Sequence, residues 1–125
     1  MRKFNPKIRK KWSWGKCGYY KGFWCDSSWE LAFLVYHLDN KIGIKRNKKG
    51  FKYIFYKKKH LFYPDFIVNN EYFEIKGKVD RKTNAKLKCF PDNITINLID
   101  KTKIAKYTNY AIEKYGKEYA DNLYE

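Results

Sequence analysis

The chain has 125 residues, a length suited to one compact domain, and its 44% hydrophobic and 20% aromatic residues supply material for a core. Its 28 basic and 13 acidic residues leave a net charge of +15, which favours a polyanionic partner, with nucleic acid the first choice and a membrane surface the weaker one. No apolar run reaches the roughly 18 residues of a spanning helix, and charges stand where a signal peptide would have its core, so we expect a cytoplasmic protein that does not associate with membranes.

Residues 1–25 combine eight basic residues with tryptophan, tyrosine and phenylalanine, and they contain no acid. We expect a basic aromatic N-terminal arm over residues 1–25, followed by a single domain over residues 26–125. Lysines would neutralise phosphates while aromatic rings stack on bases; the candidate contacts are Lys10, Lys11, Trp12, Trp14, Lys16 and Lys21. The alternative is a disordered tail up to Lys11, followed by aromatic residues that cap the core.

Apolar residues at helical spacing predict a first helix over residues 27–40, namely Leu31, Leu34, Val35 and Leu38. At its start, Ser27 and Glu30 fit the S-x-x-E capping box, which gives Glu30 a structural role. In the alternative interpretation, Glu30 faces a catalytic cluster on the sheet and holds metal-bound water.

Between Asp39 and Asp65 the chain has nine basic residues and no acid. Residues 51–56 predict a strand that turns through residues 57–60 into a second strand over residues 61–68. Lys57, Lys58 and Lys59 fall in that turn, where they either follow a phosphate backbone or form an ordinary solvated edge.

Asn69 and Asn70 lie between two runs that favour strands, and asparagine tolerates the positive φ angles of a two-residue hairpin loop. With these two residues as the loop, Asp65 faces Glu74, and Lys76 projects from the same face. Directly opposed side chains have Cβ atoms roughly 4.5–5.5 Å apart, so two like charges there destabilise the sheet unless a cation neutralises them.

Magnesium prefers oxygen ligands, commonly one or two carboxylates completed by water and substrate phosphate. We therefore expect Asp65 and Glu74 to hold Mg²⁺, with Mn²⁺ able to substitute. Lys76 would bind the scissile phosphate or help to orient and deprotonate the attacking water. The alternative is an ordinary hairpin whose acids are solvated and in which Lys76 simply pairs with Glu74.

After the hairpin, the pattern predicts a short helix from Thr83, a strand over residues 94–99 and an amphipathic helix over residues 103–115 that ends at Gly116. Three lysines in the first part of this region either clamp a substrate backbone or are solvated: Lys78, Lys82 and Lys86.

Pro64-Asp65, followed after eight residues by Glu74-Ile75-Lys76, resembles the signature of the PD-(D/E)XK nuclease superfamily. With residues 22–31 included, the chain is similar over about residues 22–116 to small phage-type or mobile-element endonucleases of the homing kind. The resemblance implies an α/β fold with a restriction-endonuclease-like αβββαβ core, in which helices flank a mixed central sheet. It maps the catalytic residues of the superfamily onto Glu30, Asp65, Glu74 and Lys76.

Together these inferences predict a Mg²⁺-dependent endonuclease that hydrolyses DNA phosphodiester bonds, in the manner of a homing or junction-resolving enzyme. One site cuts one strand, so a double-strand cut suggests a homodimer. Two alternatives stay open, namely RNA cleavage by the same site and a non-catalytic basic nucleic-acid-binding protein whose acids are structural.

Overall fold

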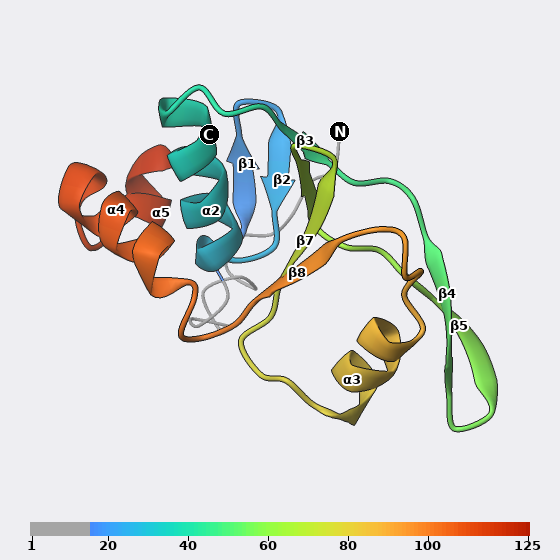
Figure 1. Ribbon diagram of the computed structural model, residues 1–125. Helices are drawn as coiled ribbons and strands as arrows, with labels where there is room; N and C mark the ends of the chain where they lie inside the picture. The colour runs from blue at the N-terminus through green and yellow to red at the C-terminus, as the bar shows by residue number, and fades with distance from the viewer. Residues whose placement is uncertain (1–15) are drawn as a thin grey trace. The chain divides into compact units, whose positions relative to one another are not determined.

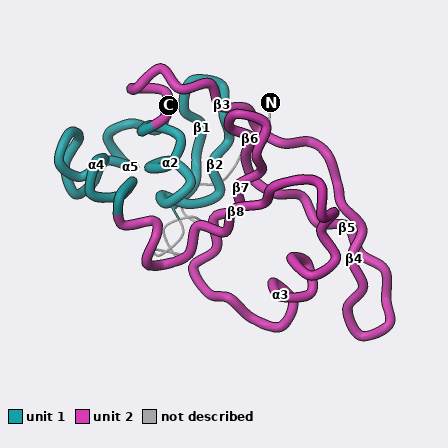
Figure 2. The backbone as a smooth tube through the Cα atoms, in the orientation of Figure 1, with its two compact units in different colours: residues 1–36, 106–125 teal, residues 37–105 magenta. Residues whose placement is uncertain are grey.

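The computed structural model describes residues 16–125 as an α/β protein whose contacts divide it into two compact units (Figures 1 and 2). In its described part, unit 1 combines residues 16–36 with residues 106–125, and unit 2 contains residues 37–105. Four residues expected to bind nucleic acid lie outside the described part, namely Lys10, Lys11, Trp12 and Trp14. Within residues 16–125, no helix has the length and apolar character needed to cross a bilayer.

Unit 1 begins with an antiparallel hairpin of β1 (Gly18–Tyr20) and β2 (Phe23–Cys25). The C-terminal end of the chain closes on this hairpin. The backbone N–H of Glu125 donates to the carbonyl of Tyr19 at 2.8 Å, and the Tyr124 hydroxyl donates to the carbonyl of Lys16 at 2.9 Å. Residues 18–25, which the sequence assigned to an arm, are therefore built into the fold of unit 1.

The helix predicted over residues 27–40 is confirmed as α2 (Ser28–Asp39), which starts in unit 1 and ends in unit 2. The ring of Phe33, which is fully buried, packs against Tyr107 of α4 (Ala105–Tyr115) with 4.8 Å between ring centroids. Gly116 then ends α4 at a φ of 95°, as predicted. The short helix α5 (Tyr119–Leu123) was not predicted.

Unit 2 contains a four-stranded sheet in the order β3-β6-β7-β8, formed by β3 (Ile44–Arg46), β6 (Phe66–Val68), β7 (Glu71–Ile75) and β8 (Ile96–Ile99). The first three strands pair antiparallel, and β8 pairs parallel to β7. A parallel pair needs a crossover connection, which here carries α3 (Arg81–Lys88). The α/β class and the mixed central sheet are thus confirmed.

A separate two-stranded sheet in unit 2 consists of β4 (Phe51–Phe55) and β5 (Lys58–Phe62). Its inner side chains build an aromatic cluster of buried residues that also includes Phe90, namely Phe51, Tyr53, Phe62 and Phe90. Tyr72 of β7 packs on this cluster, with its ring centroid 5.2 Å from that of Phe51. The aromatic cluster therefore covers part of the β7 face that also carries Glu74.

The prediction of one strand over residues 61–68 was wrong, because β5 and β6 belong to different sheets. Pro64, fully buried between them, has no N–H to donate to a ladder. Its carbonyl instead accepts a hydrogen bond from the side chain of Asn47 at 2.9 Å. The chain thus leaves one sheet at Tyr63 and enters the other at Phe66.

The turn predicted over residues 57–60 lies earlier, at Tyr56 and Lys57, whose φ angles are 51° and 62°. Lys58 and Lys59 consequently belong to β5. The sequence also missed β3, which takes the place in the four-stranded sheet that was expected for residues 51–56. A three-residue strand offers too little alternation to be recognised by pattern.

Candidate functional site

The hairpin that carries the candidate site has the predicted loop and register. Asn69 and Asn70 adopt φ angles of 52° and 66°, both in the left-handed region that asparagine tolerates. Val68 pairs with Glu71 and Phe66 with Phe73. Asp65 directly precedes β6, so the same register places it opposite Glu74.

The carboxyl groups of Asp65 and Glu74 interact directly, through their charges and through a hydrogen bond. Burial raises the pKa of Asp65 to about 8, together with the charge of Glu74 and a hydrogen bond between the two carboxyl groups. These effects outweigh the hydrogen bond that the N–H of Ile75 donates to Asp65 Oδ2 at 2.8 Å, and the nearby charge of Arg46. Below pH 8 the pair therefore retains a proton, because two adjacent carboxylates cannot both ionise at little cost.

A divalent cation fits the donor atoms of this pair. The site offers carboxylate oxygens alone, as hard ions such as Mg²⁺ prefer, and Oε1 of Glu74 is buried from solvent. Across residues 16–125, no group of three or more His, Cys, Asp or Glu side chains is arranged to hold a metal. An ion bound here would take Asp65 and Glu74 as its protein ligands, with water and substrate phosphate completing the shell.

Arg46 is a site residue that the sequence reasoning missed. It pairs with Phe66 across β3 and β6, and its guanidinium lies 4.6 Å from the centre of the Phe66 ring. Its Nη1 donates to the backbone carbonyl of Asp65 at 3.4 Å, and its charge lowers the pKa of Asp65. One feature of the sequence could have drawn attention to Arg46, since it is one of only four arginines in a chain rich in lysine.

Asn47 fixes the segment that presents Asp65. Its side chain is buried and donates to the carbonyls of Pro64 and Lys49, both at 2.9 Å, while its Oδ1 accepts from the N–H of Lys49. Its backbone N–H also donates to the carbonyl of Asp65 at 3.1 Å. Asn47 therefore satisfies the carbonyl groups of Pro64 and Asp65, and it positions the segment that carries the Asp65 carboxyl group.

Lys76 lies half-buried directly after β7, where its N–H donates to the carbonyl of Ile99 at 3.1 Å. Hydrogen bonds from Thr83 and, to a smaller extent, the charge of Lys76 lower the pKa of Asp80, the residue that caps α3. The Lys76 ammonium thus acts on Asp80, whereas the cation that acts on Asp65 is Arg46.

Glu30, the fourth predicted site residue, belongs to unit 1 and caps α2. The Ser27 hydroxyl accepts from the N–H of Glu30 at 3.2 Å, and Oε1 of Glu30 accepts from the N–H of Asp26 at 3.2 Å. These bonds confirm the capping role that the sequence left open. The catalytic role of Glu30 stays a prediction, because unit 2 holds the other three residues.

The lysines expected to contact nucleic acid differ in their surroundings. Lys16 forms an ion pair with Asp121 at 2.8 Å, and Lys86 extends over the Phe62 ring, 5.1 Å from its centre. The remaining ones are exposed, namely Lys21, Lys57, Lys58, Lys59, Lys78 and Lys82. Exposure makes these six accessible to a polyanion without identifying which polymer binds.

Comparison of the chain with protein-family models, with curated proteins and with solved structures gave no match.

Proposed function

We propose that the protein is a Mg²⁺-dependent endonuclease that hydrolyses DNA phosphodiester bonds at a site formed by Asp65, Glu74 and Lys76. The observation that carries this proposal is the contact between the Asp65 and Glu74 carboxyl groups, with the pKa of Asp65 raised to about 8. An acid pair held together in this way is unfavourable by itself and becomes favourable when a cation replaces its proton.

The ion, when bound, would make a coordinated water a stronger nucleophile and offset the charge that develops on the phosphate. The N–H of Ile75 donates a hydrogen bond to Oδ2 of Asp65, and this bond would orient the carboxyl group for binding the ion. Lys76 would bind a phosphate oxygen or orient the attacking water. The charge of Arg46 favours the ionised form of Asp65. This is the form in which the carboxyl group binds a metal ion near neutral pH.

The order of elements supports the resemblance to the PD-(D/E)XK superfamily. Helix α2, strands β3, β6 and β7, helix α3 and strand β8 follow one another in the αβββαβ order once the β4–β5 hairpin is treated as an insertion between β3 and β6. The two acids and Lys76 then fall at the second and third strands of this core.

A plasmid assay tests the proposal. Supercoiled DNA is incubated at low salt with and without Mg²⁺, using wild-type protein and the variants Asp65→Asn, Glu74→Gln and Lys76→Met. We expect nicking that requires the ion and falls by at least about 100-fold in each variant. The Mn²⁺ reaction is run in parallel, because oxygen ligands accept either ion.

Matched controls come from neighbouring residues. Glu71 is an exposed acid on the same strand as Glu74 and accepts a hydrogen bond from Asn97, which a glutamine also allows. Lys103 is an exposed lysine outside the site. Glu71→Gln and Lys103→Met should cut like wild type, and equal nicking by all variants would mean that the site does not cut DNA.

The same assay separates the alternatives. A non-catalytic binding protein would retard DNA in a gel without cutting it, and Glu74→Gln would leave that binding unchanged. Cutting of RNA in preference to DNA of matched sequence would move the proposal to RNA, since the exposed lysines attract either polymer. A double-strand cut by two copies predicts a dimer mass in gel filtration with DNA.

A further inference from the structure

The hairpin β4–β5 has an exposed face in which lysines alternate with aliphatic residues. Lys52 stands opposite Leu61, and Ile54 stands opposite Lys59, so the four side chains share one face of the ribbon. Ile54 and Leu61 are 57% and 53% exposed, which is unusual for large aliphatic side chains in an ordered ladder. We refer to these four residues, Lys52, Ile54, Lys59 and Leu61, as the ribbon face.

The other face of the same hairpin is buried. Phe51, Tyr53 and Phe62 alternate with the residues of the ribbon face and pack into the aromatic cluster. The hairpin lies beside α3 within unit 2 (Figure 1), and Ala85 of α3 packs against the same aromatic cluster. Packing on one side thus leaves the ribbon face exposed on the other, and the core does not require its aliphatic residues.

The tip of the hairpin retains side chains that its conformation disfavours. Tyr56 and Lys57 have φ angles of 51° and 62°, nearly the same as those of Asn69 and Asn70 in the β6–β7 loop. Asparagine tolerates this region, whereas tyrosine and lysine incur roughly 1 kcal/mol or more each. Tyr56 is also 71% exposed. Strain at an exposed aromatic and basic tip is typical of a binding surface.

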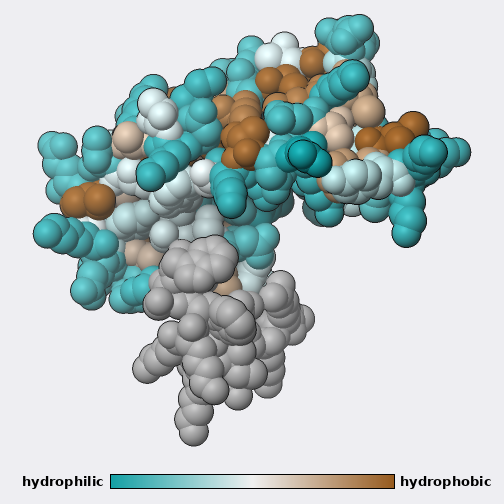
Figure 3. All heavy atoms as spheres, turned by 90° about the horizontal axis from the view of Figure 1, so that it is seen from below, coloured by the Kyte–Doolittle hydropathy of each residue, from teal (hydrophilic) through white to brown (hydrophobic). Residues whose placement is uncertain are grey.

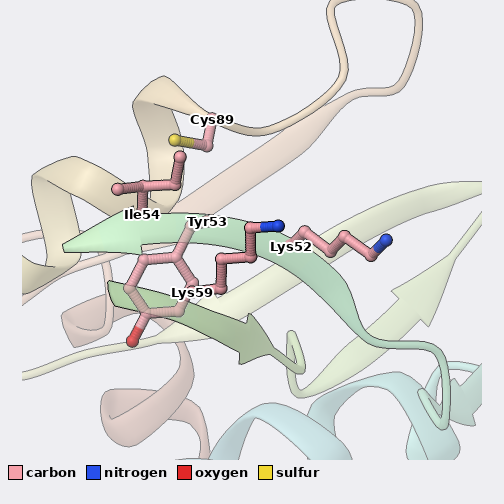
Figure 4. A pocket seen from close by; sticks show the side chains of 5 residues that line it. All are labelled: Lys52, Tyr53, Ile54, Lys59 and Cys89. Atoms are coloured by element: carbon pink, nitrogen blue, oxygen red, sulfur yellow. The ribbon is translucent and has the colours of Figure 1, made fainter. Parts of the chain in front are cut away.

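Charge restricts what the ribbon face can bind. The hairpin contains four lysines and no acid, within a stretch from Asp39 to Asp65 that lacks acids altogether. Lys52, Ile54 and Lys59 line a shallow pocket of about 380 Å³ together with Tyr53 and Cys89, and Figure 4 shows both lysine side chains extending in the same direction. Figure 3 shows apolar and hydrophilic side chains interspersed on one side of the molecule. An anionic ligand with apolar edges complements this pattern.

We propose that the ribbon face and its tip dock in the major groove of duplex DNA. A two-stranded ribbon has the width that this groove admits, lysines reach the phosphates on either side, and aliphatic groups contact thymine methyls and base edges. Single-stranded nucleic acid is the poorer occupant, because successive bases stack on several aromatic platforms, whereas the ribbon face carries none and the tip exposes the single ring of Tyr56. The inference rests on the proposed function only for the choice of DNA.

Binding is measured by fluorescence anisotropy with a short labelled duplex in EDTA, across a salt series, so that no cutting interferes. The variant Lys52→Gln/Lys59→Gln should bind the duplex at least about tenfold more weakly at low salt, with the slope of log affinity against log salt reduced by about 2. Ile54→Ser/Leu61→Ser should weaken binding several-fold without changing that slope.

The matched control is Lys101→Gln/Lys103→Gln, which removes two exposed lysines from the turn after β8. Thermal unfolding of every variant checks that the fold is retained. Duplex binding by the ribbon variants equal to that of the control would overturn the inference, as would tighter binding of single-stranded DNA or RNA than of duplex. If the ribbon variants lose duplex binding but the wild type does not nick plasmid, the nuclease proposal alone is refuted. If the wild type nicks plasmid but the ribbon variants bind duplex normally, the ribbon proposal alone is refuted.

Discussion

The protonation of Asp65 gives the sharpest test of the site, because it connects stability with pH in a way that needs no substrate. Without a metal, burial and the neighbouring Glu74 raise the pKa of Asp65 from 3.8 to about 8. Between these values the folded protein binds a proton that the unfolded chain has released. The free energy of unfolding therefore falls as the pH rises from about 4 to 8.

The magnitude follows from linkage. Each unit of pH within this window removes at most about 1.4 kcal/mol, so going from pH 5 to pH 8 removes at most about 3–4 kcal/mol. Water that reaches the half-buried carboxyl reduces the expected value to about 1–2 kcal/mol. For a chain of this size that corresponds to a decrease in melting temperature of several degrees.

The assay is urea unfolding in EDTA at pH 5, 6, 7 and 8, with wild type beside Asp65→Asn. The asparagine can still accept the Ile75 N–H and carries no ionisable group, so its stability should fall less over this range. Adding Mg²⁺ at pH 8 should restore about 1.4 kcal/mol to wild type when the ion is ten times its dissociation constant, and nothing to the variant. Parallel pH curves for the two proteins would refute the raised pKa.

Three further variants test separate parts of unit 2. Arg46→Met removes the cation that lowers the pKa of Asp65, so the pH of half-maximal cutting should move upward in a pH profile. Asn47→Ala leaves the buried carbonyl of Pro64 unsatisfied and removes the partly buried hydrogen bonds to Lys49, so it should lower the free energy of urea unfolding by about 2–3 kcal/mol. Asn93→Ala, in an exposed loop, should change it by less than about 0.5 kcal/mol. Tyr56→Asn relieves the left-handed φ and should raise that free energy by up to about 1 kcal/mol.

The part of the site that could be predicted from the sequence depends on local chemistry. Asn69 and Asn70 determine a two-residue loop, and once the loop is fixed, the period of two along each strand determines every pair in the hairpin. That is why the contact between Asp65 and Glu74 followed from the sequence alone. The cap of α2 by Ser27 and the end of α4 at Gly116 are local in the same sense.

The parts that were missed depend on pairing between distant residues. Arg46 reaches Asp65 only because β3 pairs with β6, and nothing in the three residues of β3 indicates that partner. The break between β5 and β6 depends on the contact of Asn47 with Pro64, seventeen residues away. The β1–β2 hairpin likewise relies on the last residues of the chain. Such contacts have no periodicity to reveal them.

The sign of the stability change also discriminates between the two classes of function. If Asp65 and Glu74 were structural, removing either charge would leave a polar partner unsatisfied and weaken the fold. If the pair is kept for a cation, its repulsion is a destabilising feature retained for activity, so at pH 8 in EDTA the Glu74→Gln variant should be more stable than wild type, and with Mg²⁺ it should be inactive. Both measurements use the same two proteins. A less stable Glu74→Gln variant at pH 8 would favour the non-catalytic alternative, and this measurement needs no substrate.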